Sequence, residues 1–414
     1  MVAFVIRLGW ALVQPADDAA IDRLPDQREY LLLGRGLLHG QGLNFYDPRF
    51  RDVVYAFRTP GYPVLVAACG GNVRVVRVVQ AVIDTSTVLA ILLLALRWLA
   101  PGPSLFAAGI VAFNPFLIYF TGLVLTETLF TSMLAWGMVL LLGARAPSHD
   151  DANDASWRDT LLWLTGGLLL ALSILVRQSA MGLPMALGVA AAFVNRRQGG
   201  PYHRRWPLPV GTTMLLLTMG VLLPWGYRNY RVLGAWVWTT TNGGITAYDG
   251  FNPDATGASD QSFVQSMPEL RGMGELGRSH HLSDLAKDFI CRQPLRAAEL
   301  ALVKAGRMWS PVPLSQDYGG WKYRAVGMLY SLPFDVLVVI GLLRRAPGGG
   351  PLSRSAKAFL LLPAIYFTGV HMLSVGSLRY RIPAEPPMAV VAASAAFLPG
   401  VAGWKRAEML KSDE

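Results

Sequence analysis

The sequence feature that most restricts the possible folds is a series of long apolar blocks, separated by short joints rich in Arg, Pro and Gly. Blocks of roughly 17–25 apolar residues are long enough to cross a bilayer as helices. Of the 414 residues, 53% are hydrophobic and only 15% are charged, whereas about a quarter of the residues in soluble domains are charged. The pattern therefore predicts an all-α, polytopic membrane protein, with residues 1–414 forming a single integral-membrane domain.

About ten of these blocks qualify as membrane spans. The first, residues 1–13, is short and lacks the small-residue cleavage site of a signal peptide, so we interpret it as a first helix. The others lie at about 76–98, 104–122, 127–143, 159–176, 179–194, 207–225, 325–343, 357–375 and 383–403.

Basic residues in the short connections predict the orientation of the spans. The segment 195–206, NRRQGGPYHRRW, is the most basic, and residues 342–350 and the C-terminal tail agree with it. Such connections usually face the cytoplasm, so we expect a multi-pass protein of the cell inner (plasma) membrane with both termini inside. The opposite, periplasmic or extracellular, face then carries a first external loop, 14–75, and a large external loop, 226–324.

The net charge of +10 does not indicate a nucleic-acid partner, because the basic residues lie at predicted helix ends and suit contacts with membrane lipids. The only cysteines, Cys69 and Cys291, both fall in expected external segments. A disulfide between them and two isolated structural thiols both fit the sequence, and we favour the latter. His280 and His281 are adjacent, a spacing at which two rings rarely point the same way, so we do not expect them to bind a metal.

The first external loop contains two segments that are expected to lie at the membrane surface. In 24–43, apolar residues at helical spacing beside basic residues predict a surface helix, with Asp26 near its start. In 57–68, Pro60 and Pro63 interrupt an apolar run that is too short to cross the bilayer. Arg58 at its start could bind lipid headgroups in general or one phosphate specifically.

Two further acids lie in apolar sequence. An ionised side chain at the bilayer centre costs about 2.5–3.5 kcal/mol even on the lenient insertion scale. Glu127, in GLVLTETLF, is expected at the external end of a helix, where capping that helix is the alternative to a role in a site. Asp84, in QAVIDTSTVL, is expected within a span, where helix packing through Thr85 and Ser86 is the simpler interpretation.

Several arginines join these acids on the same face. A single arginine at a helix end usually extends its charge to water, but several beside two carboxylates suit a phosphate-bearing lipid with a carboxylate working next to it. The basic residues expected at that phosphate are Arg58, Arg228, Arg379 and Arg381, and the residues expected to line the site are Glu29, Tyr30, Arg77, Gln80, Arg177, Asn229, Asn242 and Tyr380.

The order and spacing of these motifs resemble the GT-C glycosyltransferases, specifically glycosyltransferase family 39, which includes protein O-mannosyltransferases and lipid A aminoarabinose transferases. The resemblance covers nearly the whole chain. In order along the chain, its motifs are PDQREY, RTPGYP, VRVVQA, NPFLIYFTGLVLTETLF, PWGYRNY, TTTNGG, DGFNPDATG and RYRIP.

The resemblance implies a GT-C arrangement of about ten spans with external juxtamembrane helices. It also implies transfer of a sugar from a polyprenyl-phosphate-linked donor to an acceptor glycan, lipid or protein on the non-cytoplasmic face. Asp26 and Glu127 match the acidic residues of the first and second external loops. Arg58 matches the residue that contacts the carrier phosphate, and Arg379 and Arg381 match the late arginine motif only as a pair.

From the chemistry, Asp26 is the expected general base of an inverting transfer, with arginines stabilising the departing phosphate. Asp22 is a rival for that role, and the sequence does not decide whether a divalent metal ion binds at Asp26 and Glu127. Glu29 lies three residues after Asp26, whereas protein O-mannosyltransferases have an adjacent Asp-Glu pair, so the acceptor remains open.

A polytopic transporter and a non-catalytic lipid-binding envelope-assembly protein are the alternatives. The transferase requires the carboxyl groups of Asp26 and Glu127 within roughly 10 Å of each other, facing one cavity with Arg58. The sequence does not name the sugar, the acceptor or the carrier length.

Overall fold

The computed structural model describes residues 1–143, 155–197, 209–315, 320–344 and 352–396. The basic connections that predict orientation lie mostly outside these ranges, as does the end of the last expected span. Within them the chain is predominantly helical, and its one sheet is a two-stranded antiparallel hairpin of β1 (Phe45–Asp47) and β2 (Asp52–Val54).

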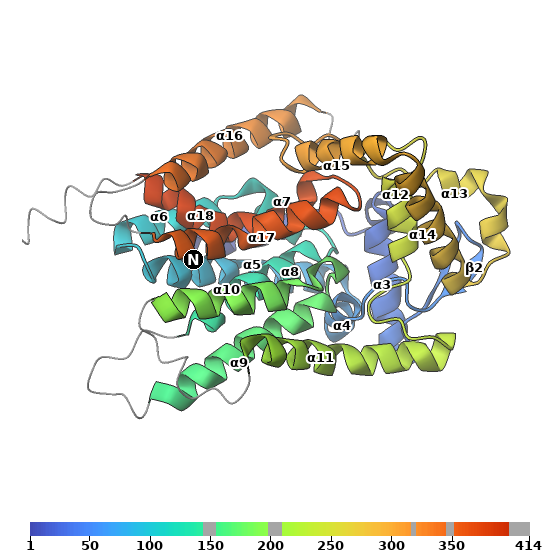
Figure 1. Cartoon of the computed structure of the whole chain (residues 1–414), viewed down its shortest axis with the longest axis horizontal. Coiled ribbons are helices and arrows are strands. Elements are labelled where there is room, and N and C mark those ends of the chain that lie inside the picture. Colours follow the sequence, from blue (N-terminus) through green and yellow to red (C-terminus); the bar gives the residue numbers. More distant parts are fainter. Residues whose placement is uncertain (144–154, 198–208, 316–319, 345–351, 397–414) are drawn as a thin grey trace, which may run out of the picture.

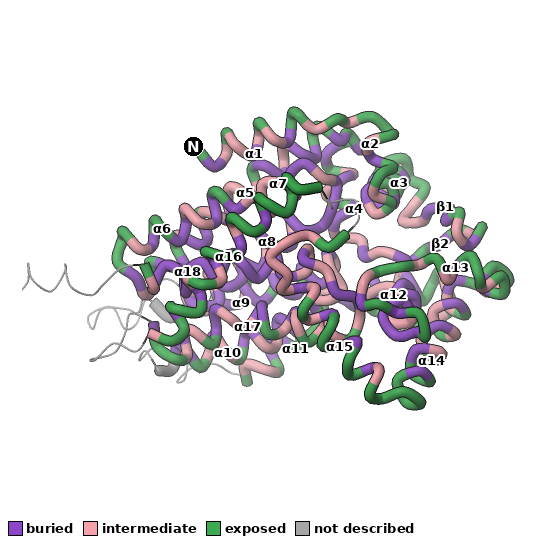
Figure 2. The backbone as a smooth tube through the Cα atoms, turned by 90° about the horizontal axis from the view of Figure 1, so that it is seen from above, coloured by how far each residue is buried: buried purple, intermediate pink, exposed green. Residues whose placement is uncertain are grey.

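Most of the helices form an elongated bundle along the long axis of the molecule (Figure 1). They are α1 (Val2–Val13), α5 (Val73–Leu96), α6 (Pro101–Ala112), α7 (Pro115–Thr121), α8 (Glu127–Leu142), α9 (Ala155–Ile174), α10 (Leu183–Arg197), α11 (Val210–Leu233), α16 (Trp321–Leu343), α17 (Arg354–Met372) and α18 (Glu385–Ala396). Helix α5 packs against α1, α6 and α8, and α18 packs against α16, α6, α5 and α17. Figure 2 shows that their inward faces are buried.

Three helices, α5, α11 and α16, are long and apolar enough to cross a membrane, and the α6–α7 pair adds a fourth if it is one span. Helices α1 and α8 are apolar but shorter. The prediction of about ten spans is therefore confirmed only in part among the described residues. Helix α10 has 15 residues, fewer than the roughly 20 that a span needs.

The expected span at 104–122 is two helices rather than one. Helices α6 and α7 meet at a 49° bend, and Asn114 and Pro115 lie at the break. The Asn114 side chain accepts hydrogen bonds from the amides of Phe116 and Leu117 and so caps the start of α7. Pro115 has no amide to continue the first helix. Hydropathy does not reveal this break, because the residues on both sides of it are equally apolar.

A further difference from the prediction concerns the end of α11. Helix α11 continues to Leu233 and ends at Gly234, which adopts φ 73°, a conformation that glycine reaches at little cost. The motif PWGYRNY is therefore helical, and α11 extends beyond the expected end of the span at residue 225. Cys69 is buried, Cys291 is exposed and both are free thiols.

The remaining elements gather at one end of the bundle, on the right of Figure 1. They are α2 (Asp18–Asp22), α3 (Pro25–Leu38), the β1–β2 hairpin, α4 (Gly61–Ala68), α12 (Gly243–Gly250), α13 (Phe263–Ser266), α14 (Glu275–Arg292) and α15 (Pro294–Met308). Helix α3 lies across the bundle axis, and Leu33 on it packs into an apolar cluster with Phe45, Ile245 and Leu282. The region expected as a loop, 226–324, is thus largely a small helical layer over this end.

Candidate active site

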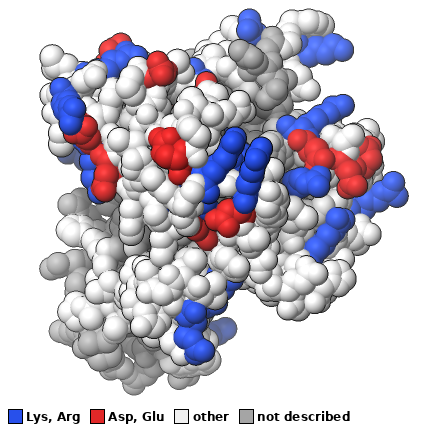
Figure 3. Space-filling model, turned by 90° about the vertical axis from the view of Figure 1, so that its right-hand side faces the viewer, with Lys and Arg blue, Asp and Glu red and all other residues white. Residues whose placement is uncertain are grey.

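Five segments of the chain bring charged side chains together at this end of the bundle, which Figure 3 views directly. Helix α3 carries Asp26 and Glu29, and the stretch before α4 carries Arg58. Three connections of the bundle carry the other members: Glu127 begins α8, Arg177 follows α9, and Arg379 lies in a short 3-10 turn between α17 and α18.

Arg379 joins the two predicted catalytic carboxylates. Its Nε donates to Glu127 Oε1 at 2.7 Å, and its Nη1 donates to Asp26 Oδ2 at 3.2 Å. Because one guanidinium makes both contacts, the carboxyl groups lie within the roughly 10 Å expected of a shared site. The helix-capping alternative for Glu127 does not describe this arrangement, since its carboxylate contacts arginines from other connections.

Arg58 joins the two carboxylates of α3. Its Nη2 lies 2.5 Å from Asp26 Oδ1, and its Nε donates to Glu29 Oε2 at 2.7 Å. The guanidinium also lies 5.4 Å from the ring centroid of Tyr30, a distance at which an aromatic face attracts a cation. Asp26 therefore accepts from two arginines that reach it from different parts of the chain.

The backbone after Arg58 is held against the α9–α10 corner. The Gly61 amide donates to the Leu175 carbonyl at 2.7 Å, and Thr59 Oγ1 donates to the Val176 carbonyl at 3.2 Å. A Cβ at residue 61 would lie only 2.6 Å from the Leu175 oxygen, so this approach requires glycine. The motif RTPGYP thereby packs the segment that carries Arg58 against the corner that carries Arg177.

Glu127 and Arg177 retain unused hydrogen-bonding capacity. Arg177 Nη1 lies 3.5 Å from Glu127 Oε1, and the Arg177 guanidinium lies 5.5 Å from the Tyr380 ring centroid. Tyr380 in turn stacks on His371 at 3.8 Å. Glu127 Oε2 and Arg177 Nη1 are both buried and have no hydrogen-bond partner. Buried polar atoms are normally satisfied, so this pair has hydrogen-bonding capacity that the protein itself does not use.

The charges shift the two α3 carboxyls in opposite directions. Burial raises the pKa of Asp26, but Arg58 and Arg379 outweigh it and hold that pKa well below its usual value. Burial raises the pKa of Glu29, and the neighbouring Asp26 charge adds to the effect despite Arg58 and Arg49. Burial lowers the pKa of Arg58 and of Arg379, but the facing acids raise both above the usual value.

One member of the cluster was missed by the sequence analysis. Arg49 donates to Glu29 at 3.0 Å, to Asp47 at 2.6 Å and to Gln261 at 2.7 Å. It therefore ties the hairpin to both α3 and the segment after α12. The stretch FYDPRFRD contains two arginines with no spacing that distinguishes one from the other, so no sequence signal could have selected Arg49.

Other predicted site residues lie behind the cluster. Gln80 accepts from the Tyr62 hydroxyl at 2.6 Å and donates to the carbonyls of Thr121 and Leu123, so it shapes the corner that precedes Glu127. Arg77 donates to the carbonyls of Gln14 and Pro15 at 2.8 and 3.0 Å. Both residues fix backbone rather than contacting Asp26 or Glu127.

The residues expected from α11 and the large loop lie to one side. Arg228 donates to the carbonyls of Tyr55 and Leu43 at 2.7 and 2.8 Å, and Asn229 donates to the Val237 carbonyl at 2.8 Å. The two Arg228 contacts join α11 to the segment between α3 and α4. Asn242 lies at the start of α12, and its buried side-chain oxygen Oδ1 has no hydrogen-bond partner.

Arg381 is separated from the cluster by its burial. It donates to Glu385 at 2.9 Å, to Ser331 Oγ at 2.6 Å and to the Ser310 carbonyl at 3.1 Å, and its side chain is 1% exposed. Of the late arginine pair, the structure therefore places Arg379 in the cluster and Arg381 in the bundle.

The remaining acids are also placed outside the cluster. Asp22 pairs with Arg28 at the surface, at 2.6 Å. Asp84 forms a fully buried ion pair with Arg7 of α1, which also donates to the carbonyls of Val111 and Ala112. The neighbouring Thr85 and Ser86 donate to carbonyls of their own helix, and Ser86 also contacts Ser132 and Trp136 of α8. The expected helix packing therefore occurs through Ser86, while the partner of Asp84 itself is Arg7.

The cluster does not fit a divalent metal ion. The guanidinium of Arg379 occupies the place between Asp26 and Glu127 where a cation would bind. No group of three His, Cys, Asp or Glu side chains suited to a metal occurs among the residues that the structure describes. We therefore derive no step through a metal.

No family model matches the chain, and no curated protein matches it. Solved structures do. AglB, the oligosaccharyltransferase of Archaeoglobus fulgidus in complex with an inhibitory peptide and a dolichol-phosphate, superposes with a TM-score of 0.53 over 100% of this chain and 53% of its own, at 12% identity. The apo oligosaccharyltransferase of the same organism gives 0.53 over 99% and 51%, at 14% identity. The fold is GT-C-like.

This similarity confirms the fold that the sequence motifs predicted, and the chain spans about half the length of the oligosaccharyltransferase structures it matches. ArnT from Cupriavidus metallidurans, bound to undecaprenyl phosphate, also matches over 95% of this chain and 76% of its own, at 15% identity. Its TM-score of 0.41 is too low to support any comparison of sites.

Proposed function

We propose that this protein is a membrane glycosyltransferase that moves a sugar from a polyprenyl-phosphate-linked donor to an acceptor hydroxyl. The observation that carries the proposal is the bridge from Asp26 through Arg379 to Glu127, with Arg58 and Arg177 beside it. Cations of this density suit a phosphate, and the carboxylates among them suit proton transfer. A transporter would not need them gathered at one end of the bundle.

An apolar pocket supplies a place for the polyprenyl chain. It has a volume of about 720 Å³ and lies between α16 and α17, with Val338, Leu342, Ile365 and Met372 among its lining residues. Met372 ends α17, and the turn that carries Arg379 follows a few residues later. A carrier lying along this pocket would present its phosphate toward the charge cluster. The oligosaccharyltransferase of similar fold has been solved with a dolichol-phosphate.

The transfer step assigns a task to each charged group. The acceptor oxygen attacks the anomeric carbon as its proton passes to the Asp26 carboxylate. The bond from that carbon to the phosphate oxygen breaks, and the phosphate leaves with the electron pair, stabilised by Arg58 and Arg379. Attack opposite the leaving group inverts the anomeric centre. Glu127 orients Arg379, and its second carboxylate oxygen accepts a hydrogen bond from the substrate that receives the sugar.

Donor binding also prepares the base. In the resting arrangement Arg58 and Arg379 depress the pKa of Asp26, and a carboxylate so stabilised is a weak base. A carrier phosphate competes for the same two guanidinium groups. As they turn to the phosphate, Asp26 loses its strongest partners and its basicity rises, so proton abstraction is favoured only when a donor is present.

The reaction is proposed to occur on the non-cytoplasmic face of the inner membrane. The support is the pattern of basic connections in the sequence and the position of the cluster at one end of the bundle, away from the helix ends that those connections join (Figure 1). Cysteine-accessibility labelling of the connection 195–206 tests this orientation, and labelling from outside the cell would reverse it.

Mass analysis of cell-envelope glycans and lipids, in cells with and without the gene, tests the proposed function. The expected result is loss of one sugar from an envelope component together with accumulation of a polyprenyl-phosphate-linked sugar. Unchanged glycans with an unchanged donor pool would contradict the proposal. Complementation with wild type but not with Asp26→Asn separates catalysis from an assembly role.

A further inference from the structure

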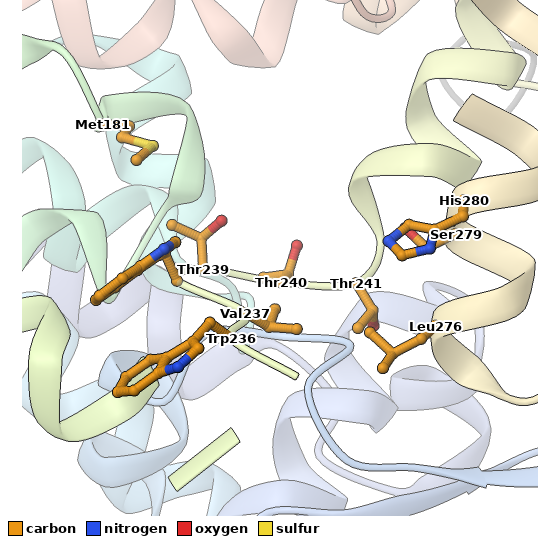
Figure 4. Close-up of a pocket in the computed structure, with 10 residues that line it drawn as sticks. Met181, Trp236, Val237, Thr239, Thr240, Thr241, Leu276, Ser279 and His280 are labelled. Atoms are coloured by element: carbon orange, nitrogen blue, oxygen red, sulfur yellow. The ribbon is translucent and has the colours of Figure 1, made fainter. Parts of the chain in front are cut away.

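A second cavity lies beside the charge cluster. It has a volume of about 310 Å³, at the lower end of the roughly 300–1,000 Å³ typical of small-ligand pockets. Its walls come from Met181 before α10, from the stretch 236–241, and from Leu276, Ser279 and His280 of α14. Figure 4 shows Met181 and His280 on opposite sides of this space.

An aromatic stack forms one wall. Trp236 lies between two rings, stacked on Tyr230 with centroids 5.3 Å apart and on Trp238 with centroids 5.2 Å apart. Both faces of Trp236 therefore take part in the stack, whereas Trp238 joins it through one face. Trp238 is 36% exposed. The stack presents a rigid apolar platform at the edge of the cavity.

The rest of the cavity lining is mostly polar. Thr239, Thr240, Ser279 and His280 line it, and the hydroxyls of Thr239 and Thr240 point into the space between Met181 and His280 (Figure 4). Hydroxyl groups can both donate and accept. Among the residues that the structure describes, no acidic side chain, lysine or arginine lines the cavity, so its chemistry differs from that of the charge cluster.

Two contacts attach this cavity to the charge cluster. The Thr241 amide donates to the Ala56 carbonyl at 2.9 Å, two residues before Arg58. Thr240 Oγ1 donates to Gln178 Oε1, and Gln178 follows Arg177. The stretch 239–241 therefore borders the cavity while contacting the segments that carry Arg58 and Arg177.

We propose that this cavity is a subsite for one saccharide ring of the acceptor. The ring stacks on Trp238 and forms hydrogen bonds with the hydroxyl groups that line the rest of the cavity. Aromatic faces carry partial negative charge, which attracts the C–H groups on one face of a sugar ring, while the sugar hydroxyls can donate to and accept from the hydroxyls that line the cavity. The inference rests on the proposed function, since it identifies the acceptor as a glycan.

Tryptophans also occur where a protein meets the membrane–water interface, which is the competing role for this stack. The polar wall argues against it, because a membrane anchor needs no facing hydroxyls or enclosed volume. The same stack would then be exposed to lipid along its whole length, whereas Trp236 and Trp238 line a pocket with α14.

Binding is measured without turnover, so that failure of this inference is distinct from failure of the proposed function. The full chain in lipid nanodiscs is titrated with a panel of methyl pyranosides and short oligosaccharides, followed by saturation-transfer NMR. Trp238→Ala should weaken binding of the best panel member roughly 2- to 12-fold, from loss of an aromatic contact. Ser279→Trp should abolish it by filling the cavity.

Matched controls keep the result interpretable if a variant is unstable. Ser279→Ala leaves the cavity open, and Trp321→Ala removes a tryptophan that is 75% exposed on α16, away from the cavity. Trp321→Ala should bind as wild type does. Ser279→Ala, which loses one hydroxyl of the lining, should bind more weakly than wild type but far better than Ser279→Trp. Binding that is equal in Ser279→Trp and Ser279→Ala would overturn the inference, as would no binding of any panel member by wild type.

Turnover with water distinguishes the two possible sources of the sugar. If the ring belongs to the acceptor, Trp238→Ala should reduce transfer to the acceptor but not the slower hydrolysis of the donor. Equal loss of both would assign the ring to the donor instead and overturn the acceptor subsite. If Trp238→Ala leaves transfer to the acceptor unchanged and lowers the stability of the protein only when it is in lipid, the stack is a membrane anchor and the subsite is excluded.

Discussion

Arg379 and Arg381 lie two residues apart in one motif, yet they belong to regions of opposite character. Arg381 is 1% exposed, and its partners Glu385, Ser331 and Ser310 meet its hydrogen-bonding needs within the bundle. Arg379 is 30% exposed and connects carboxylates from two other connections, beside atoms with no partner. In the internal region, around Arg381, the charged groups find their hydrogen-bond partners within the protein. In the external region, the cluster around Arg379 at the end of the bundle, some hydrogen-bonding atoms have no partner.

The comparison teaches that charge in apolar sequence is not by itself a sign of function. The Arg7–Asp84 pair, like Arg381–Glu385, is buried on both sides, and such a pair is best understood as structure. A site is distinguished by arginines that share carboxylates from several connections and by unused capacity, as at Glu127 Oε2 and Arg177 Nη1.

The largest expected effect concerns the external region. Asp26→Asn keeps the size of the side chain and one of its two arginine contacts. It also removes the charge that competes with the donor phosphate, so the protein should fold and donor affinity should not fall. Turnover should fall about 10²–10⁴-fold through loss of the base, measured as transfer of a radiolabelled sugar. Asp22→Asn is the matched control and should be nearly silent, because Asp22 pairs with Arg28 at the surface.

The internal region should respond in stability rather than in turnover. Arg381→Met leaves Glu385 buried without its cation, and breaking a buried pair costs about 3–5 kcal/mol of unfolding free energy. Arg379→Met should cost much less, since that arginine is partly exposed. Denaturant unfolding in detergent compares the two. Equal losses would remove the distinction between the regions, and Arg381→Met/Glu385→Gln should recover part of the loss.

Donor affinity should change next in size. Arg58→Ala removes a charged hydrogen bond to the carrier phosphate and should weaken donor binding by about 1.5–3 kcal/mol. Lys should rescue it partly, because a point charge remains but the planar fork is lost. Donor binding is followed with undecaprenyl phosphate in nanodiscs, and equal binding by wild type and Arg58→Ala would make Arg58 a general headgroup contact.

The smallest effect is a shift in pH dependence. Arg58 and Arg379 hold the pKa of Asp26 below its usual value of 3.8, so the base stays ionised in the free enzyme above that pH. The profile of kcat/KM should therefore show no acid limb from this group above about pH 5. Arg379→Ala raises the pKa of Asp26, and its acid limb should move to higher pH. Identical limbs in both proteins would exclude Asp26.

Much of the fold could be predicted from hydropathy alone. The expected span at 127–143 corresponds to α8 nearly to the residue, and the one at 325–343 corresponds to α16, which begins four residues earlier. Long apolar runs allow few alternatives. The break at Asn114 and the pairing of Arg7 with Asp84 could not be predicted. The first depends on local capping, and the second joins residues 77 positions apart.

The site was predictable where motifs carried it and unpredictable where packing decided. Asp26, Arg58, Glu127 and one of the two late arginines converge as their spacing implied. Arg228 resembled them in sequence, yet its guanidinium is used by the carbonyls of Tyr55 and Leu43. Whether an arginine reaches a carboxylate or a carbonyl depends on side-chain packing, which residue order does not record.

The central claim is that the external cluster transfers a sugar from a lipid carrier. Release of free polyprenyl phosphate from a panel of polyprenyl-phosphate-linked sugars, in proteoliposomes with wild type or Asp26→Asn, tests it most directly. The account predicts that wild type releases the carrier from at least one donor, whereas Asp26→Asn binds that donor and releases almost none. Equal release by both proteins, or neither binding nor release by wild type across the panel, would contradict it.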